Sequence, residues 1–120
     1  MGEFEQQYVS ESDLNLFFKT MGIVGADTPV TVVGFNNQSN PGVEANLDIQ
    51  YIMGVSRGVP TTVWSIYANS TVEIDDILKW GYQVGNVTNP PLVNSLSYGM
   101  TESHVDECVV APLSPPPPSP

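Results

Sequence analysis

The chain has 120 residues, which is room for one domain, and 41% of them are apolar, a share typical of folded proteins. Its formal net charge of -10, with three basic against thirteen acidic side chains, predicts repulsion from nucleic acid and from anionic membrane surfaces. The sequence has no apolar run long enough for a transmembrane helix and no signal-peptide pattern at its start. A single cysteine, Cys108, excludes an internal disulfide and a multi-cysteine metal site.

The first predicted element is an amphipathic helix with Ser10 as its N-cap and Gly22 as its stop. Its apolar positions recur at spacings of three and four: Leu14, Phe17, Phe18 and Met21. The run 29–34 is β-branched and bounded by turn residues, so it predicts a buried strand.

A second helix is predicted to start at Pro41, after an Asn40 cap, and to run to about Met53, with Gly54 as its stop. The β-branched and aromatic run 61–68 predicts the second strand.

The capping box 70–73 predicts the start of a third helix, which continues through Trp80. Residues 92–98 predict a third strand that ends at Gly99. Helices that alternate with strands indicate parallel crossovers, so the predicted fold class is α/β, a parallel sheet with helices on both faces. Three strands are only a piece of such a sheet, so we expect an incomplete domain with uncovered edges and a tendency to aggregate.

Glu44 and Asp48 are four residues apart and share one face of the second predicted helix. At about 100° per residue they fall within an otherwise apolar arc, whereas Asn46 and Gln50 form the polar stripe. Two carboxylates on a half-buried face would tend to share a proton, and such a pair can act as a general base. The same spacing is also typical of an acidic pair on a solvated helix face, so both interpretations stay open.

Residues 42–53, Gly-Val-Glu-Ala-Asn-Leu-Asp-Ile-Gln-Tyr-Ile-Met, resemble the catalytic helix of the sedolisin family of serine-carboxyl peptidases. Residues 3–8 and 12–14 resemble the family's opening loop and first helix. Ser97-Tyr98-Gly99, with Glu102, resembles the family's strand that ends in Ser-Tyr-Gly. The three elements occur in the family's order, and the resemblance covers residues 3–107.

The resemblance implies a partial subtilisin-like fold, with residues 1–108 as the N-terminal part of a sedolisin-like peptidase domain. It implies that Glu44 is the general base for a serine nucleophile and that Asp48 is its hydrogen-bonded partner. A carboxylate base suits acid pH, where histidine would be protonated. The expected parent enzyme is therefore an acid-acting peptidase, lysosomal or secreted, that trims tripeptides or cleaves internally. Three Asn-x-Ser/Thr sequons, at Asn37, Asn69 and Asn86, favour a secretory route.

The sequence departs from the family in the rest of the catalytic machinery. It contains neither the Ser-Gly-Thr-Ser motif of the nucleophile nor the Gly-Asp-x-Gly segment of the oxyanion-stabilising Asp. The family's calcium site lies in the missing C-terminal part, so no cofactor is expected in this chain. We therefore expect the chain to be inactive alone and to act on a peptide substrate only if completed. Ser97 lacks a glycine-flanked elbow and is interpreted as a strand end rather than a nucleophile.

Residues 109–120 form a proline-rich tail, predicted to be disordered or polyproline II. An alternative function follows from it: a non-catalytic remnant whose tail binds an SH3- or WW-type module, although no basic anchor accompanies the prolines. His104 and Cys108 offer only two good metal ligands, fewer than zinc requires, so no metal site is expected.

Overall fold

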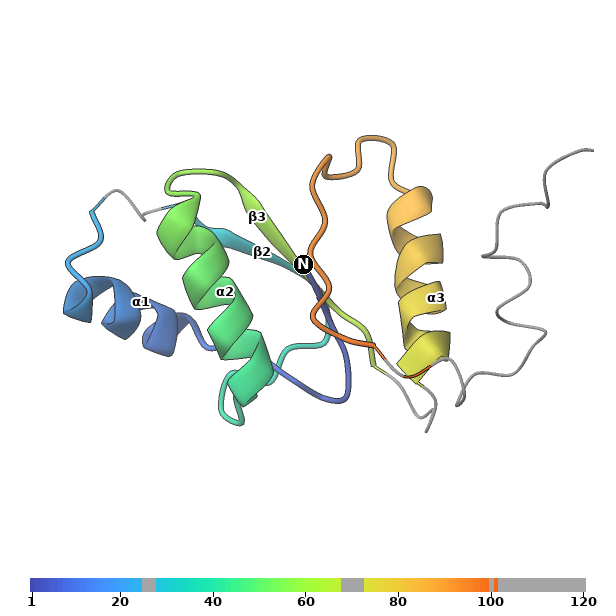
Figure 1. Cartoon of the computed structure of the whole chain (residues 1–120), viewed down its shortest axis with the longest axis horizontal. Helices are drawn as coiled ribbons and strands as arrows, with labels where there is room; N and C mark the ends of the chain where they lie inside the picture. The colour runs from blue at the N-terminus through green and yellow to red at the C-terminus, as the bar shows by residue number, and fades with distance from the viewer. Residues whose placement is uncertain (25–27, 68–72, 100, 102–120) are drawn as a thin grey trace, which may run out of the picture.

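A computed structural model of the chain describes residues 1–24, 28–67, 73–99 and 101, which form a parallel sheet with helices packed against it (Figure 1). Along the chain the elements are β1 (Gly2–Glu3), α1 (Glu11–Thr20), β2 (Val30–Gly34), α2 (Val43–Val55), β3 (Thr61–Ser65) and α3 (Glu73–Gly85). The predicted α/β class is confirmed, and the small parallel sheet is consistent with part of a subtilisin-like fold. None of the helices in these residues is long and apolar enough to cross a membrane.

The described strands lie in the order β1-β3-β2, and both pairings are parallel. β3 is central, with Val63 beside Val32 of β2 and Trp64 beside Gly2 of β1. Successive side chains of a strand point to opposite faces, so Val63 and Trp64 enter two different cores. Each face of the sheet therefore needs its own layer of helices to bury its apolar side chains.

Helices α1 and α2 cover one face and α3 covers the other, as predicted (Figure 1). The first core joins α1 and α2 to Val63 and centres on Leu14, Phe18, Ile49 and Met53. The second core joins α3 to Phe4 and Trp64. The α1–α2 core contains more of the buried side chains, so this half of the molecule is the more fully covered.

Local signals placed α1 correctly. The Ser10 Oγ accepts a hydrogen bond from the Asp13 backbone N–H at 3.2 Å, which confirms the N-cap. The helix ends at Thr20, and Gly22 follows with a φ of 63°, a left-handed conformation that glycine adopts without strain.

The predicted start of α2 was wrong by two residues. Its N-cap is Gly42, which has no side chain to offer, and the Glu44 backbone N–H donates instead to the Gln7 side-chain oxygen at 3.1 Å. The Gln7 side chain lies where a Cβ on Gly42 would stand, so glycine is needed for this approach. The helix also continues through Gly54 to Val55, because the Ser56 hydroxyl donates to a carbonyl in its last turn.

The predicted third strand, 92–98, is not a strand in the structure. This segment lies beside β1 with one backbone hydrogen bond, from Gly2 N–H to the Ser95 carbonyl at 3.1 Å. Its first part, with Leu92 and Val93, is exposed to solvent, and no backbone hydrogen bond from it to a strand is seen among the described residues. The third strand of the described sheet is instead β1, which was not predicted from the sequence. Strand β3 also ends at Ser65, short of residue 68, because both neighbouring strands end there.

Several predictions concern residues that the structure does not describe. These are most of the capping box 70–73, the sequon at Asn69, His104, Cys108 and the tail 109–120.

Candidate active site

The predicted acids lie at the carboxyl-terminal edge of the sheet. Both are on α2, which begins just after the end of β2, and both side chains are half-buried. This edge is where parallel α/β sheets commonly bind ligands, because the loops that follow the strands converge there. Of the two interpretations that the spacing left open, the structure has the half-buried face for both Glu44 and Asp48.

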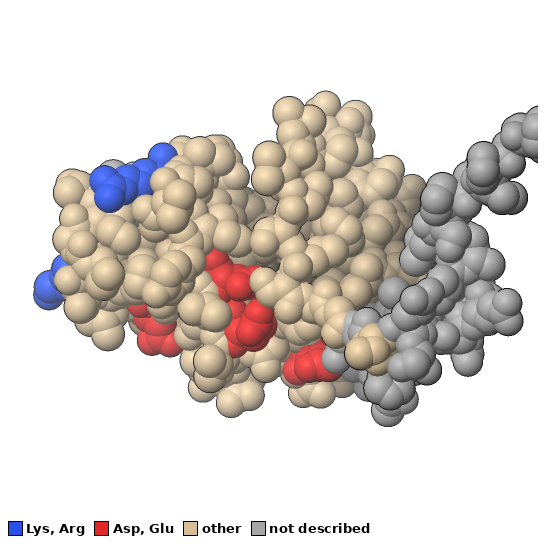
Figure 2. All heavy atoms as spheres, viewed as in Figure 1, with Lys and Arg blue, Asp and Glu red and all other residues tan. Residues whose placement is uncertain are grey.

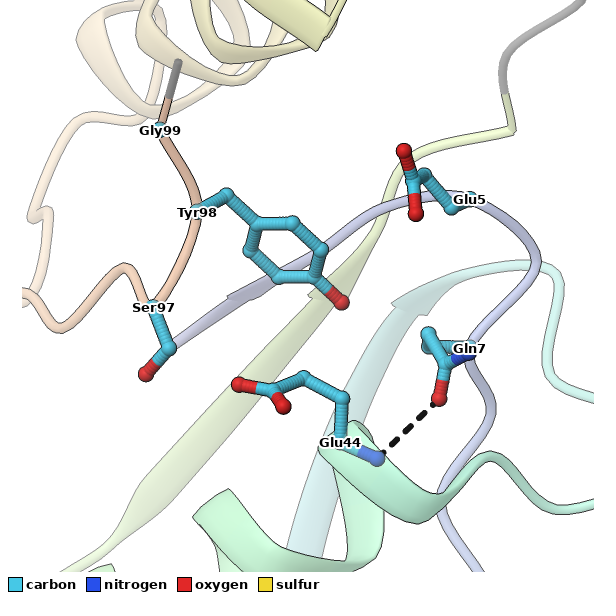
Figure 3. A pocket seen from close by; sticks show the side chains of 6 residues that line it. All are labelled: Glu5, Gln7, Glu44, Ser97, Tyr98 and Gly99. Carbon is cyan, nitrogen blue, oxygen red and sulfur yellow. Dashed lines mark hydrogen bonds between the residues drawn. The ribbon is translucent and has the colours of Figure 1, made fainter. Parts of the chain in front are cut away.

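A pocket of about 250 Å³ lies beside Glu44 (Figure 3). Three segments that are distant in sequence line it: the turn after β1, the start of α2 and residues 97–99. Its lining residues are Glu5, Gln7, Glu44, Ser97, Tyr98 and Gly99. In Figure 3 the Glu44 carboxylate extends toward Ser97 and Tyr98, while its backbone N–H is held by Gln7. The carboxylate is therefore directed into the pocket by an anchored helix end.

Asp48 contacts the same segment through Ser97. The Ser97 hydroxyl donates to the Asp48 carboxylate at 2.7 Å, a contact between residues 49 positions apart. Ser97 therefore joins α2 to the wall of the pocket, a contact that its interpretation as a strand end did not include.

A third carboxyl group, Glu3, lies next to the pair and was missed as a site residue. It ends β1 and is 1% exposed, and the Tyr98 hydroxyl donates to its Oε2 at 3.1 Å. Within the described residues its Oε1 is buried without a hydrogen-bond partner. Sequence alone gave one weak signal, an acidic residue flanked by Gly2 and Phe4 in a segment that resembles the family.

The pKa of Glu3 is raised to about 8, chiefly by burial and to a smaller extent by the nearby charges of Asp48 and Glu44. The hydrogen bond from Tyr98 and the amino-terminal ammonium act in the opposite direction. Glu3 is therefore mostly protonated at neutral pH.

Tyr98, in the segment that follows α3, donates the hydrogen bond that Glu3 accepts. Burial, followed by the Glu3 charge, raises the pKa of the Tyr98 hydroxyl, so it stays a hydrogen-bond donor. Its ring packs edge-on against Phe4, with the centroids 4.7 Å apart. One aromatic side chain thus fixes residues 97–99 against the end of β1.

Figure 2 shows acidic side chains gathered near the middle of this face, with the Lys and Arg side chains toward one end of the molecule. Within the described part of the chain, no group of three or more histidine, cysteine or acidic side chains is arranged to hold a metal ion. The arrangement is suited to accepting a proton: a carboxylate in a pocket, a second carboxylate held by a hydroxyl, and a third carboxyl that is protonated.

No protein-family model and no solved structure matches the chain. Among curated proteins, the chain is 35% identical over 106 residues to tripeptidyl-peptidase 1 of Dictyostelium discoideum, which covers 88% of this chain and 17% of that protein. It is 28% identical over 110 residues to tripeptidyl-peptidase 1 of Rattus norvegicus and of Homo sapiens, covering 90% of this chain and 19% of each relative. The chain thus spans less than a fifth of the length of these relatives.

Proposed function

Since the chain is homologous to part of the tripeptidyl-peptidase 1 proteins of the sedolisin family, we propose that it carries the acidic half of a serine-carboxyl peptidase site. Glu44 is the general base and Asp48 is its partner. The observation that carries this proposal is the shared pocket edge, where Glu44 enters the pocket and Asp48 is bound by Ser97. The substrate is a peptide, and the reaction is its hydrolysis at acid pH.

The two acids have different surroundings, which supports two different roles. Ser97 occupies one oxygen of Asp48, so Asp48 is constrained in orientation. No such contact to the Glu44 carboxylate is seen among the described residues, and this side chain faces the pocket. A general base must reach the proton it removes, whereas its partner must hold it in place. Glu44 fits the first role. Asp48 is assigned the second by its place one turn further along the same helix face, since no hydrogen bond between the two carboxyl groups is seen among the described residues.

Carboxylates retain their basic form at a pH where histidine is protonated and cannot act as a base. Because Glu3 is mostly protonated below its pKa of about 8, it adds little negative charge beside the pair under acid conditions. This environment supports an acid-acting enzyme and, with the homology, a lysosomal or secreted parent.

The nucleophile is the missing component. The sequence contains no Ser-Gly-Thr-Ser motif. In this proposal Ser97 is a lining residue of the pocket that donates a hydrogen bond to Asp48, and it is not the nucleophile. Nucleophile, base and oxyanion donors act as a unit, so the chain alone has no appreciable peptidase activity.

A chimera tests the proposal. The matched 106-residue span of the Dictyostelium discoideum relative is replaced by the corresponding residues of this chain, and tripeptide release from a peptide with a free amino terminus is followed at acid pH. The chimera should be active, and Glu44→Gln should lower kcat by about 10²- to 10⁴-fold, the usual contribution of a general base. Glu11→Gln, at an exposed position on α1, is the matched control and should have no effect. Full activity in the Glu44→Gln chimera would refute the assignment.

A further inference from the structure

The turn that follows β1 has an unusual backbone conformation. The Gln7 N–H donates to the Phe4 carbonyl oxygen at 2.9 Å, so residues 4–7 form a β-turn. Its central residues, Glu5 and Gln6, have φ values of 53° and 59°, a left-handed conformation that normally favours glycine or asparagine. No other non-glycine residue in the part of the chain that the structure describes has a positive φ. Such strain persists only where surrounding contacts enforce it, and it is concentrated at functional sites.

The turn brings Gln7 to the start of α2. The Gln7 Oε1 accepts the Glu44 N–H at 3.1 Å, and the Gly42 N–H donates to the carbonyl oxygen of Tyr8 at 2.9 Å. Gln7 thus supplies the helix cap that Gly42, which has no side chain, cannot provide. The start of α2 is therefore fixed at two points to the segment that leaves the turn.

The same contact determines where the Glu44 carboxylate lies. Among the described residues no hydrogen bond to this carboxylate is seen, so its position depends on the backbone from which it extends. Asp48 differs, because Ser97 holds its carboxylate directly. In Figure 3 the Gln7 side chain reaches the Glu44 backbone, and the Glu44 carboxylate extends away from it toward Ser97. Gln7 therefore acts on Glu44 through the backbone N–H and not through the carboxylate.

We propose that Gln7 is a positioning residue for Glu44, an inference that rests on the proposed role of Glu44 as the general base. The turn 4–7 fixes the Gln7 amide, and the amide fixes the start of α2, so that the carboxylate enters the pocket in one orientation. A misplacement of about 1 Å in a catalytic group can lower a rate by about 10²-fold, so a contact at the backbone of the base affects the reaction. Glutamine suits this role because its oxygen accepts a hydrogen bond without adding negative charge to a pocket that already contains Glu5 and Glu44.

Three variants of the chimera with the Dictyostelium discoideum relative test the proposal. Gln7→Met keeps the length of the side chain and removes the acceptor, whereas Gln7→Glu keeps an oxygen at the same position. Gln6→Met, at an exposed position in the same turn, is the matched control. We expect Gln7→Met to lower kcat by about ten- to a hundredfold with KM within about twofold of wild type. Gln7→Glu should retain kcat within about threefold, and Gln6→Met should change neither constant.

A double variant separates positioning of the base from other effects on the rate. If Gln7 acts through Glu44, adding Gln7→Met to Glu44→Gln should lower kcat by less than about twofold. A full further loss in that background would show that Gln7 acts independently of Glu44 and would overturn the proposal. Equal kcat values for Gln7→Met and Gln6→Met would overturn it too. So would a raised KM with an unchanged kcat in Gln7→Met, because Gln7 would then bind the substrate instead.

Amide hydrogen exchange of the chain itself gives a readout that needs no enzyme activity. The Glu44 amide should exchange about tenfold faster in Gln7→Met than in wild type and at the wild-type rate in Gln7→Glu, with the Ile49 amide unchanged in both. Faster exchange at Ile49 as well would show that Gln7 stabilises the whole helix rather than the position of Glu44, which overturns the proposal. An inactive wild-type chimera, or full activity of its Glu44→Gln variant, refutes the proposed function and with it the base that Gln7 would position. Unchanged exchange at Glu44 in Gln7→Met, together with a strong loss of activity in Glu44→Gln, overturns this inference alone.

Discussion

Replacing Glu3 by glutamine should remove a pH-dependent weakness of the fold. In the wild-type chain the pKa of Glu3 is raised from its ordinary 4.5 to about 8, chiefly by burial. The folded state therefore binds the Glu3 proton more tightly than the unfolded state does, and stability falls as pH rises through this interval. The stabilisation is complete below about pH 4.5 and is lost as pH passes about 8.

The size of the effect follows from the interval. The rise in the Glu3 pKa from 4.5 to about 8 corresponds to at most about 5 kcal/mol of unfolding free energy, at about 1.36 kcal/mol per pKa unit. This contribution of Glu3 is a large part of the unfolding free energy of a whole domain, which is typically about 5–15 kcal/mol. Glutamine keeps an oxygen for the Tyr98 hydroxyl and cannot ionise, so Glu3→Gln should be more stable than wild type by a few kcal/mol at pH 8 and similar at pH 4.

Urea denaturation followed by circular dichroism between pH 4 and pH 9 measures the difference directly. Other carboxyl groups titrate in both proteins, so the comparison between variant and wild type isolates Glu3. Glu11→Gln, at an exposed position, should leave the wild-type pH dependence unchanged. Parallel stability curves for Glu3→Gln and wild type would show that Glu3 ionises as readily in the fold as in the unfolded chain, and the reasoning would fail.

Two further substitutions test neighbouring contacts by the same denaturation assay. Tyr98→Phe removes the donor to Glu3 and should cost about 1–3 kcal/mol, more at pH 8 than at pH 4, whereas Tyr51→Phe, at an exposed position, should cost nothing measurable. An equal loss for both would contradict the contact. Gly34→Ala should cost about 2–4 kcal/mol, because Gly34 has a φ of 100° and an added Cβ would meet the Ser65 carbonyl oxygen. Gly22→Ala, at a φ of 63° in open space, should cost about 1–2 kcal/mol, and a similar loss at both positions would rule out the clash.

Local sequence signals predicted the elements whose causes are local. The Ser10 cap and the β-branched run 29–34 depend on neighbours along the chain, and both elements are present. The predicted burial of the run 29–34 was wrong, because β2 is an edge strand of the described sheet and its residues are half-buried or exposed. The start of α2 was misplaced because its cap comes from Gln7, which is 37 residues away from Glu44. Strand β1 was missed because two residues carry no periodicity, and only pairing with β3 makes them a strand.

The same division applies to the candidate site. Glu44 and Asp48 share a helix face, so their spacing alone brought them together. Glu3 could not be found in this way, because its hydrogen bond comes from Tyr98, 95 residues further along the chain, and its raised pKa comes from burial in the folded chain and from Asp48 and Glu44. The outward apolar side of α2 was visible in the sequence as an apolar arc, but periodicity could not tell which part of that arc faces the sheet.

The contacts of residues 95–99 have a consequence for the order of folding. This segment reaches β1 and α2 through Ser95, Ser97 and Tyr98, and each contact closes a loop of at least 49 residues. Closing such long loops costs entropy that nearby contacts do not, so the α1–β2–α2 core can form first. During synthesis, β1 and the Glu3 carboxyl would stay uncovered on that side until Tyr98 has left the ribosome. The pocket beside Glu44 is thus among the last parts of this fold to assemble, after the helix that bears its acids is already in place.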